Sequence, residues 1–79
     1  MFGKKNKVHT YISKSYDLEN TKDFDEFYGI VDIINEFDFA IDEKNIIYGE
    51  PLFNWANIKV KTKEEMMEVW LIKHGFVEP

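Results

Sequence analysis

The sequence lacks cysteine entirely, and none of its ten basic residues is arginine. Without cysteine the chain has no disulfide, no thiolate zinc site and no thiol nucleophile. Arginine makes most bidentate contacts to guanine and phosphate, so its absence argues against specific DNA reading. No apolar run approaches the ~20 residues of a membrane span, and no apolar stretch follows the basic start as in a secretory signal. We therefore expect a soluble, cytoplasmic protein without a membrane partner.

Glycine and proline are also scarce, at four and two residues. The glycines are scattered, so no glycine-rich phosphate loop is present. His9 and His74 are lone histidines, without the nucleophile and acid of a catalytic triad beside them. The acidic residues 23–26 lack the ligand spacing of a calcium loop. These absences predict a protein that is not an enzyme and that binds no metal or cofactor.

Aromatic side chains, in contrast, are abundant, at 16% of the 79 residues. A chain of this length forms one domain, residues 1–79, with a small core that a few large rings can fill. The rings can also exceed what such a core hides, in which case a homodimer or an aromatic contact patch would use the surplus. The polar residues 1–6 are expected to be flexible.

The first half of the chain shows a strand pattern followed by a helix pattern. Residues 8–18 alternate as a strand. Asp23 is a good N-cap residue, and Glu26 completes a capping-box-like pair. Apolar residues from Phe24 to Phe37 then recur at helical spacing and predict a helix that faces the core. The expected inner face of the strand consists of Val8, Thr10, Ile12, Tyr16 and Leu18.

A hairpin and a further extended stretch are predicted next. Residues 37–41 alternate as a strand, residues 42–45 resemble a turn, and residues 46–48 follow as the partner strand. Pro51 cannot lie in a central strand, so it ends the hairpin. Residues 52–61 are extended again.

The last segment predicts a second helix with well-defined ends. Thr62 opens a capping box, and Gly75 is a C′ residue after which Phe76 packs back on the helix. The whole order is β-α-β-β-(β)-α, an α+β fold. A small antiparallel sheet with two helices on one face buries every apolar stripe. The face expected to be shared on this helix comprises Met66, Val69, Trp70 and Lys73.

Charge is distributed unevenly along the chain. Between Asp17 and Glu50 there are eleven acidic residues and two lysines, a local charge of −9, whereas the rest carries four acids and eight lysines. At about 100° per residue, Asp25, Asp32 and Glu36 fall within about 20° of one line, opposite the apolar helix face. Such a row resembles the phosphates of a nucleic-acid strand. The candidate partner-binding residues are Asp25, Asp32, Glu36, Asp38, Asp42 and Glu43.

Two other readings of the charges remain open. The acidic face can serve solubility alone. The lysines can also form a basic pole that binds single-stranded nucleic acid by phosphate contact and ring stacking, although the net charge of −5 argues against nucleic acid as a partner. The residues of that pole are Lys4, Lys5, Lys7, Lys14, Lys59, Lys61 and Lys63, with Tyr11, Tyr16 and Trp55.

In size and charge layout, above all from Asp17 to Glu50, the chain resembles the small proteins that lytic phages of Gram-positive bacteria use for host takeover. Some of those are DNA mimics that inhibit the histone-like protein HU or uracil-DNA glycosylase. The resemblance implies a DNA-mimicking inhibitor that covers the basic DNA-binding surface of a host protein such as HU, in the host cytoplasm. The alternative is an interaction module that contacts a host enzyme through aromatic residues such as Phe53 and Trp55.

Overall fold

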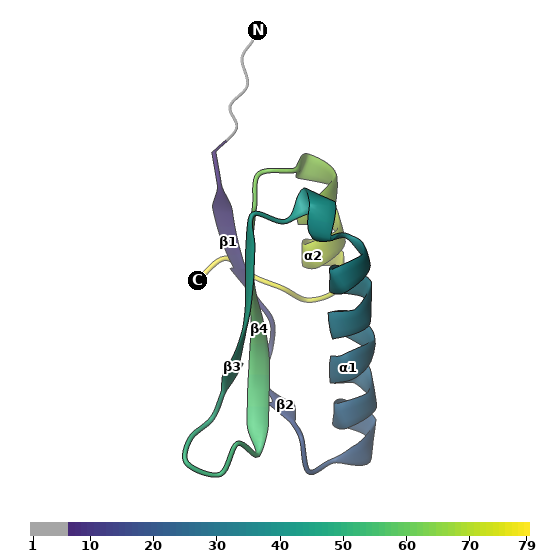
Figure 1. Ribbon diagram of the computed structural model, residues 1–79, viewed down its shortest axis with the longest axis vertical. Helices are drawn as coiled ribbons and strands as arrows, with labels where there is room; N and C mark the ends of the chain where they lie inside the picture. Colours follow the sequence, from purple (N-terminus) through teal and green to yellow (C-terminus); the bar gives the residue numbers. More distant parts are fainter. Residues whose placement is uncertain (1–6) are drawn as a thin grey trace, which may run out of the picture.

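Two helices lie on one face of a four-stranded antiparallel sheet, which confirms the predicted α+β fold (Figure 1). The computed structural model describes residues 7–79, so the predicted flexibility of residues 1–6 lies outside the described residues. The elements, in chain order, are β1 (His9–Ile12), β2 (Tyr16–Asp17), α1 (Thr21–Glu36), the 3-10 helix η1 (Asp38–Ala40), β3 (Glu43–Tyr48), β4 (Trp55–Thr62) and α2 (Glu65–Lys73).

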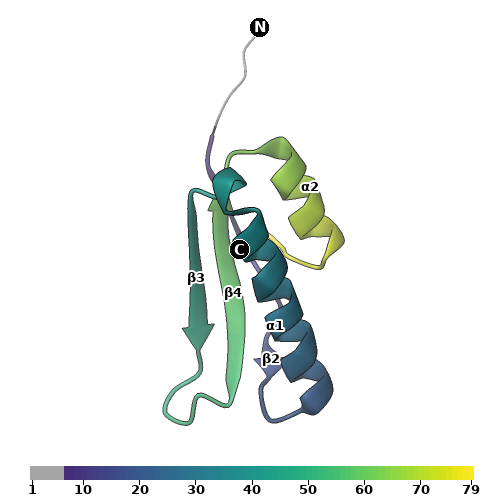
Figure 2. The same ribbon diagram turned by 45° about the vertical axis from the view of Figure 1, so that its right-hand side comes forward.

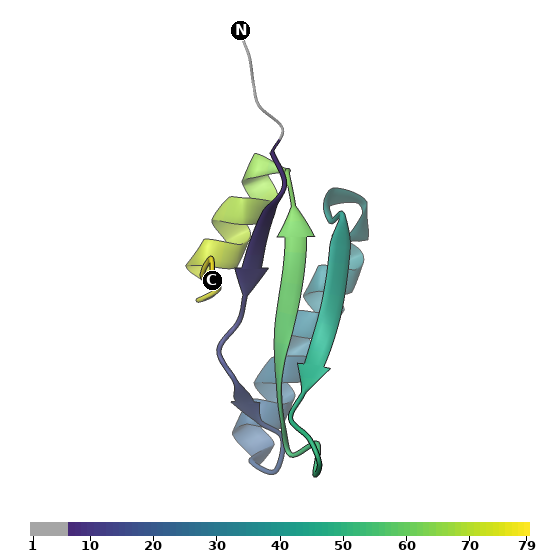
Figure 3. The same cartoon turned by 90° about the vertical axis from the view of Figure 1, so that its left-hand side faces the viewer.

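β4 is the central strand of the sheet. β3 pairs along one of its edges, and β1 and β2 pair one after the other along the opposite edge (Figure 3). Near the C-terminus, Val77 forms an isolated bridge with Ile12 and so extends the sheet beyond β1. The helices cover only one face, and α1 runs along the sheet with α2 beside its C-terminal end (Figure 2). The other face of the sheet is left open.

A bulge between β1 and β2 decides which side chains of this edge face the helices. Ile12 pairs with Lys59 and Tyr16 with Ala56, so three residues oppose two. The Ser13 N–H donates to the Ile58 carbonyl (2.9 Å), and the Ser13 hydroxyl accepts from the Ile58 N–H (2.8 Å), in place of a backbone carbonyl.

The bulge overturns part of the predicted strand face. An unbroken strand from 8 to 18 puts Tyr11 and Tyr16 on opposite faces, whereas the extra residue turns both toward the helices, where both are buried. The expectation that Thr10 and Ile12 face the core is therefore wrong. Their partners in β4 are Lys61 and Lys59, on the open face.

α1 begins earlier than the sequence pattern predicted. Its N-cap is Asn20, whose side chain accepts from the Asp23 N–H, so Asp23 is not the cap. The Asp23 carboxylate instead accepts from the Asp17 N–H (3.0 Å) and ties the end of β2 to the first turn of the helix. Asn and Asp cap helices about equally well. Capping by Asn20 extends the N-terminal end of the helix by about one turn, close to the end of β2.

The predicted strand at 37–41 and turn at 42–45 are wrong. η1 occupies Asp38–Ala40, and β3 already starts at Glu43. The hairpin that forms is β3–β4, whose six paired positions run from Glu43 opposite Lys61 to Tyr48 opposite Ala56. Five alternating residues are a weak signal, and the longer ladder with β4 provides more backbone hydrogen bonds than a short local hairpin.

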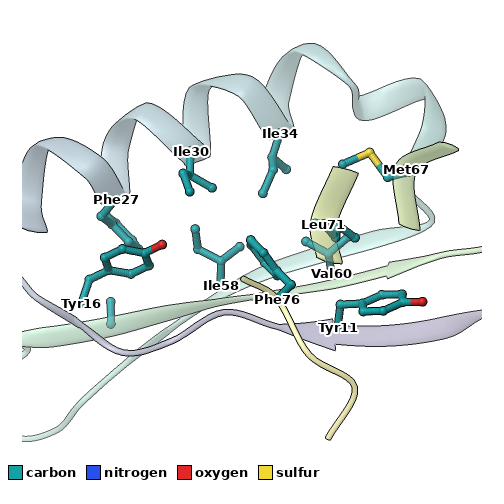
Figure 4. Close-up of a cluster of buried hydrophobic side chains, with 11 residues drawn as sticks. Tyr11, Tyr16, Phe27, Ile30, Ile34, Ile58, Val60, Met67, Leu71 and Phe76 are labelled. Carbon is teal, nitrogen blue, oxygen red and sulfur yellow. The ribbon is translucent and has the colours of Figure 1, made fainter. Parts of the chain in front are cut away.

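Side chains from every layer meet in one core (Figure 4). Phe27 and Tyr16 form its end under α1, with ring centroids 5.6 Å apart. Met67 and Leu71 bring α2 onto the sheet beside Val60. The buried residues are Tyr11, Tyr16, Phe27, Ile30, Ile34, Ala56, Ile58, Val60, Met67, Leu71 and Phe76.

The two ends of α2 differ from each other in how well they were predicted. Thr62 is not an N-cap: it is the buried last residue of β4, and its hydroxyl donates to the Ala40 carbonyl (2.6 Å). The C-terminal end is confirmed. Gly75 has a φ of 91°, and the Phe76 N–H donates to the Leu71 carbonyl (2.9 Å), as in a Schellman motif. This turn delivers Phe76 to the core.

Candidate protein-binding surfaces

The outward face of α1 carries the acidic row. Asp25, Asp32 and Glu36 all lie within the helix and are exposed, opposite the buried side chains of Phe27 and Ile34. With a rise of about 1.5 Å per residue, successive carboxylates of the row are spaced about 10 Å and about 6 Å along the axis. Among residues 7–79 none of the three takes part in an ion pair. The row is therefore an unneutralised anionic stripe.

Two of the other three predicted residues are paired with lysines. Asp38 forms an ion pair with Lys44 (2.7 Å), and Glu43 forms one with Lys61 (3.0 Å). The hydrogen bond and charge of Lys61 lower the pKa of Glu43 below its ordinary value. Glu43 also lies on the open face of the sheet, because its β4 partner alternates with the buried Val60. Asp42 is exposed, but it follows η1 in the chain and so is not part of α1, the helix that carries the row.

Helix stability does not account for the row. Glu36 lies in the last turn of α1, which has no basic residue, so its charge is unfavourable near the negative end of the helix dipole. Asp32 and Glu36 are also four residues apart, where like charges repel by a few tenths of a kcal/mol. Local interactions therefore oppose this arrangement.

An aromatic pair borders the row. Phe24 and Tyr28 are one turn apart, have ring centroids 4.8 Å apart, and are both close to half exposed. The apolar period of the sequence predicted Phe24 on the core face. Its pairing with Tyr28 was not predicted, although the i, i+4 spacing of two aromatics is the signal that could have shown it. The outer side of α1 thus combines carboxylates with apolar rings.

The basic pole loses two of its three predicted stacking residues, and only Trp55 of the three stays exposed. Tyr11 and Tyr16 are buried and cannot stack on bases, which corrects the sequence-based expectation. Burial, with the nearby carboxylates of Glu68 and Glu78, raises the pKa of Tyr11 to about 12. Lys59 and Lys61 remain on the open sheet face, but Lys61 is paired with Glu43.

The loop between β3 and β4 exposes several apolar side chains. Phe53 has a φ of 55°, in the left-handed region that a residue with a bulky side chain rarely adopts. Its ring packs edge-on against Tyr48, with centroids 6.1 Å apart, while Leu52 beside it is largely exposed. Trp55, at the end of the loop, lies so close over Gly49 that a Cβ there would overlap its indole ring.

The outward side of α2 is a third exposed surface. The sequence pattern predicted that Met66 and Val69 share one face with Trp70, but Met67 and Leu71 are the residues that enter the core. Met66 is 86% exposed and Val69 62%. Phe39 of η1, also 86% exposed, lies across a hollow of about 270 Å³ from Met66. This apolar surface was missed because the helix is apolar on both sides.

Residues 7–79 contain no group of three potential ligands arranged to hold a metal ion. Within that range, neither helix has the length and apolar character that crossing a membrane requires. No protein-family model matches the chain, and neither a curated protein nor a solved structure was found to match it.

Proposed function

We propose that this chain is a non-catalytic binding protein that uses the outward face of α1 to cover the basic, DNA-binding surface of another protein. The observation that carries the proposal is the row of Asp25, Asp32 and Glu36, exposed and free of ion pairs in residues 7–79. Asp38 and Glu43 belong to lysine pairs and are left out of the binding surface.

A basic partner removes the repulsion that the row imposes on α1. Its lysines and arginines would meet regularly spaced carboxylates, as they meet phosphates in DNA. Long-range attraction of this kind speeds association and weakens with salt. Phe24 and Tyr28 add an apolar contact at the border of the row, which suits an interface better than bulk charge alone.

Competition with DNA tests the proposal. A basic nucleoid protein of the HU type is bound to labelled duplex DNA, and the protein is added while the release of DNA is followed by fluorescence anisotropy. We expect the wild-type chain to release DNA at low salt and to lose this ability as salt rises. The double reversal Asp32→Lys/Glu36→Lys should raise the half-effective concentration at least about tenfold.

A matched control separates the row from net charge. Glu19→Lys/Glu50→Lys changes the net charge from −5 by the same four units, but both residues lie in turns outside the row. If the two double variants lose activity equally, total charge rather than the row acts. If the wild-type chain neither releases DNA nor binds any basic DNA-binding protein, the proposed function is wrong.

A second candidate function is supported by the β3–β4 loop. A positive φ at Phe53 and the exposure of Leu52 and Phe53 place apolar side chains at a strained loop tip, a combination often found at contact sites. The partner would be a protein with an apolar pocket, and binding would persist at high salt. Replacing Leu52 and Phe53 with serine and glycine should abolish such binding and leave DNA release by the α1 row unchanged.

A further inference from the structure

α2 has apolar residues on both of its sides. Met67 and Leu71 are buried against the sheet, yet Met66, Val69 and Ile72 on the outer side are 86%, 62% and 59% exposed. A nine-residue helix in a monomer normally presents polar residues to water. An outer stripe of this kind marks an interaction surface.

The outer stripe is symmetric about Val69. Met66 and Ile72 lie three residues before and after it, about 60° to either side on the helix. Glu65 and Lys73 lie four residues before and after it, about 40° to either side. Both charged residues are exposed, and within the described part of the chain neither forms an ion pair.

We propose that the outer face of α2 is the interface of a two-fold symmetric homodimer in which two α2 helices pack antiparallel, centred on Val69. In that arrangement each Val69 faces the partner's Val69, and Met66 lies level with the partner's Ile72. Glu65 lies level with the partner's Lys73, so two ion pairs of opposite direction close the ends of the apolar stripe. Such self-complementarity is what an isologous interface requires.

The charges also select the orientation of the helices. A parallel pairing would bring Glu65 next to the partner's Glu65 and Lys73 next to the partner's Lys73. Like charges facing each other across an interface disfavour that arrangement. A different partner helix could make the apolar contact, but without a base opposite Glu65 and an acid opposite Lys73 it would lack the two ion pairs. A second copy of the chain therefore fits this face best.

The size of the surface sets the expected strength. A nine-residue helix is about 14 Å long, so the helix pair alone buries less than the roughly 1,200 Å² of a stable interface. Phe39, beside Met66 across the hollow, can extend the contact at both ends of the pair. We therefore expect a reversible dimer that forms at about micromolar to sub-millimolar concentration.

Charge reversal tests the pairing by sedimentation velocity over a concentration series. Glu65→Lys alone and Lys73→Glu alone should each raise the dimer dissociation constant about tenfold or more, because each creates two like-charge pairs. The double variant Glu65→Lys/Lys73→Glu should restore dimerisation. An equimolar mixture of the two single variants should form a heterodimer, and circular dichroism confirms that all variants remain folded.

Crosslinking tests the centre of the interface. The chain has no cysteine of its own, so Val69→Cys introduces a single thiol that should form a disulfide with its copy under mild oxidation. Gly29→Cys, exposed on α1 with no heavy atom of another residue near the added Cβ, is the control and should crosslink much more slowly. Val69→Asp should keep the fold and give only monomer.

Three results would overturn the proposal: a wild-type chain that stays monomeric to about millimolar concentration, a dimer that survives Val69→Asp, or a double reversal that does not restore pairing. The dimer does not depend on the proposed function, because the α1 row lies on another helix. Asp32→Lys/Glu36→Lys should therefore still dimerise, and Val69→Asp should still release DNA at high protein concentration.

Discussion

α1 and α2 cover the same face of one sheet but present different surfaces to water. α1 buries Phe27, Ile30 and Ile34 and carries a charged outer side, whereas α2 buries Met67 and Leu71 and carries an apolar outer side. Each helix also covers one tyrosine of the β1–β2 edge: Phe27 of α1 packs on Tyr16, and Glu68 of α2 lies near Tyr11.

The difference shows that core packing constrains only the inner side of each helix. Inner residues had to fill one small core, so they are apolar in both helices. The outer residues were free to vary, and they differ in kind: three carboxylates in one case and three large apolar side chains in the other. The two different partners that we propose, a basic surface for α1 and a second copy of α2, correspond to this difference.

The largest expected effect comes from truncating an inner residue of α2, in comparison with truncating the outer residue next to it. Leu71→Ala should reduce the free energy of unfolding by about 2–5 kcal/mol, because Leu71 is fully buried and a cavity remains. Ile72→Ala, one position along, should change it by less than about 0.5 kcal/mol in dilute monomer. Urea unfolding measures both, and equal costs would contradict the assignment of the inner face.

Alkaline pH should loosen the sheet edge under α2. Burial, then the charges of Glu68 and Glu78, raise the pKa of Tyr11 from 10.0 to about 12. The folded state holds this proton more tightly than the unfolded state, so the stabilisation is complete below pH 10 and is lost as the pH rises through 12.

Urea unfolding at about pH 9 and about pH 11 checks this loss. Tyr11→Phe should remove most of the difference between the two pH values. A smaller slope should remain, because burial and then Glu26 and Asp23 also raise the pKa of Tyr16 under α1. An unchanged slope in Tyr11→Phe would mean that another group is responsible.

The bulge that turns both tyrosines toward the helices depends on one hydroxyl. Ser13→Ala leaves the Ile58 N–H without its acceptor in a buried position and should cost about 1–3 kcal/mol. Ser15→Ala, in the same bulge but exposed, should change stability by less than about 0.5 kcal/mol. Thermal unfolding measures the melting temperatures of the two variants, and equal melting temperatures would refute this role of Ser13.

The smallest effect concerns the acidic row and has the opposite sign. Glu36→Gln should stabilise the fold by about 0.3–1 kcal/mol, because it removes a negative charge from the last turn of α1 and its repulsion with Asp32. The same change should weaken the competition with DNA. A variant that is less stable than the wild-type chain, or that binds equally well, would show that the row does not trade stability for binding.

Much of the fold could be predicted because its signals are local. The apolar period of α1 and the Schellman ending at Gly75 and Phe76 follow from residues near each other in sequence. The two-layer arrangement then follows from the need to bury the apolar stripes of these elements. In the acidic row, Asp25, Asp32 and Glu36 were also found in this way, since their alignment needs only a regular helix. The binding role assigned to them stays a prediction.

Several of the errors depended on a residue outside the local pattern, whereas the N-cap error at Asp23 was local, because the true cap Asn20 lies three residues before it. The ion pairs of Asp38 with Lys44 and of Glu43 with Lys61, for example, join side chains from different elements. Residues 42–45 look like a turn locally, but β4 pairs with Glu43 and the residues after it as a strand. The local pattern allows Met66 and Val69 to face the core, but in the fold the side chains buried against the sheet are those of Met67 and Leu71.

Helical and alternating periods are properties of neighbouring residues, so the order of the residues was enough to indicate two helices and several short strands in one cysteine-free chain. Which face of each strand and of α2 points inward, in contrast, depends on packing between elements that are far apart in the chain. A one-residue bulge at Ser13 reverses the orientation of a strand, and a helix that is apolar on both sides offers no local preference for either.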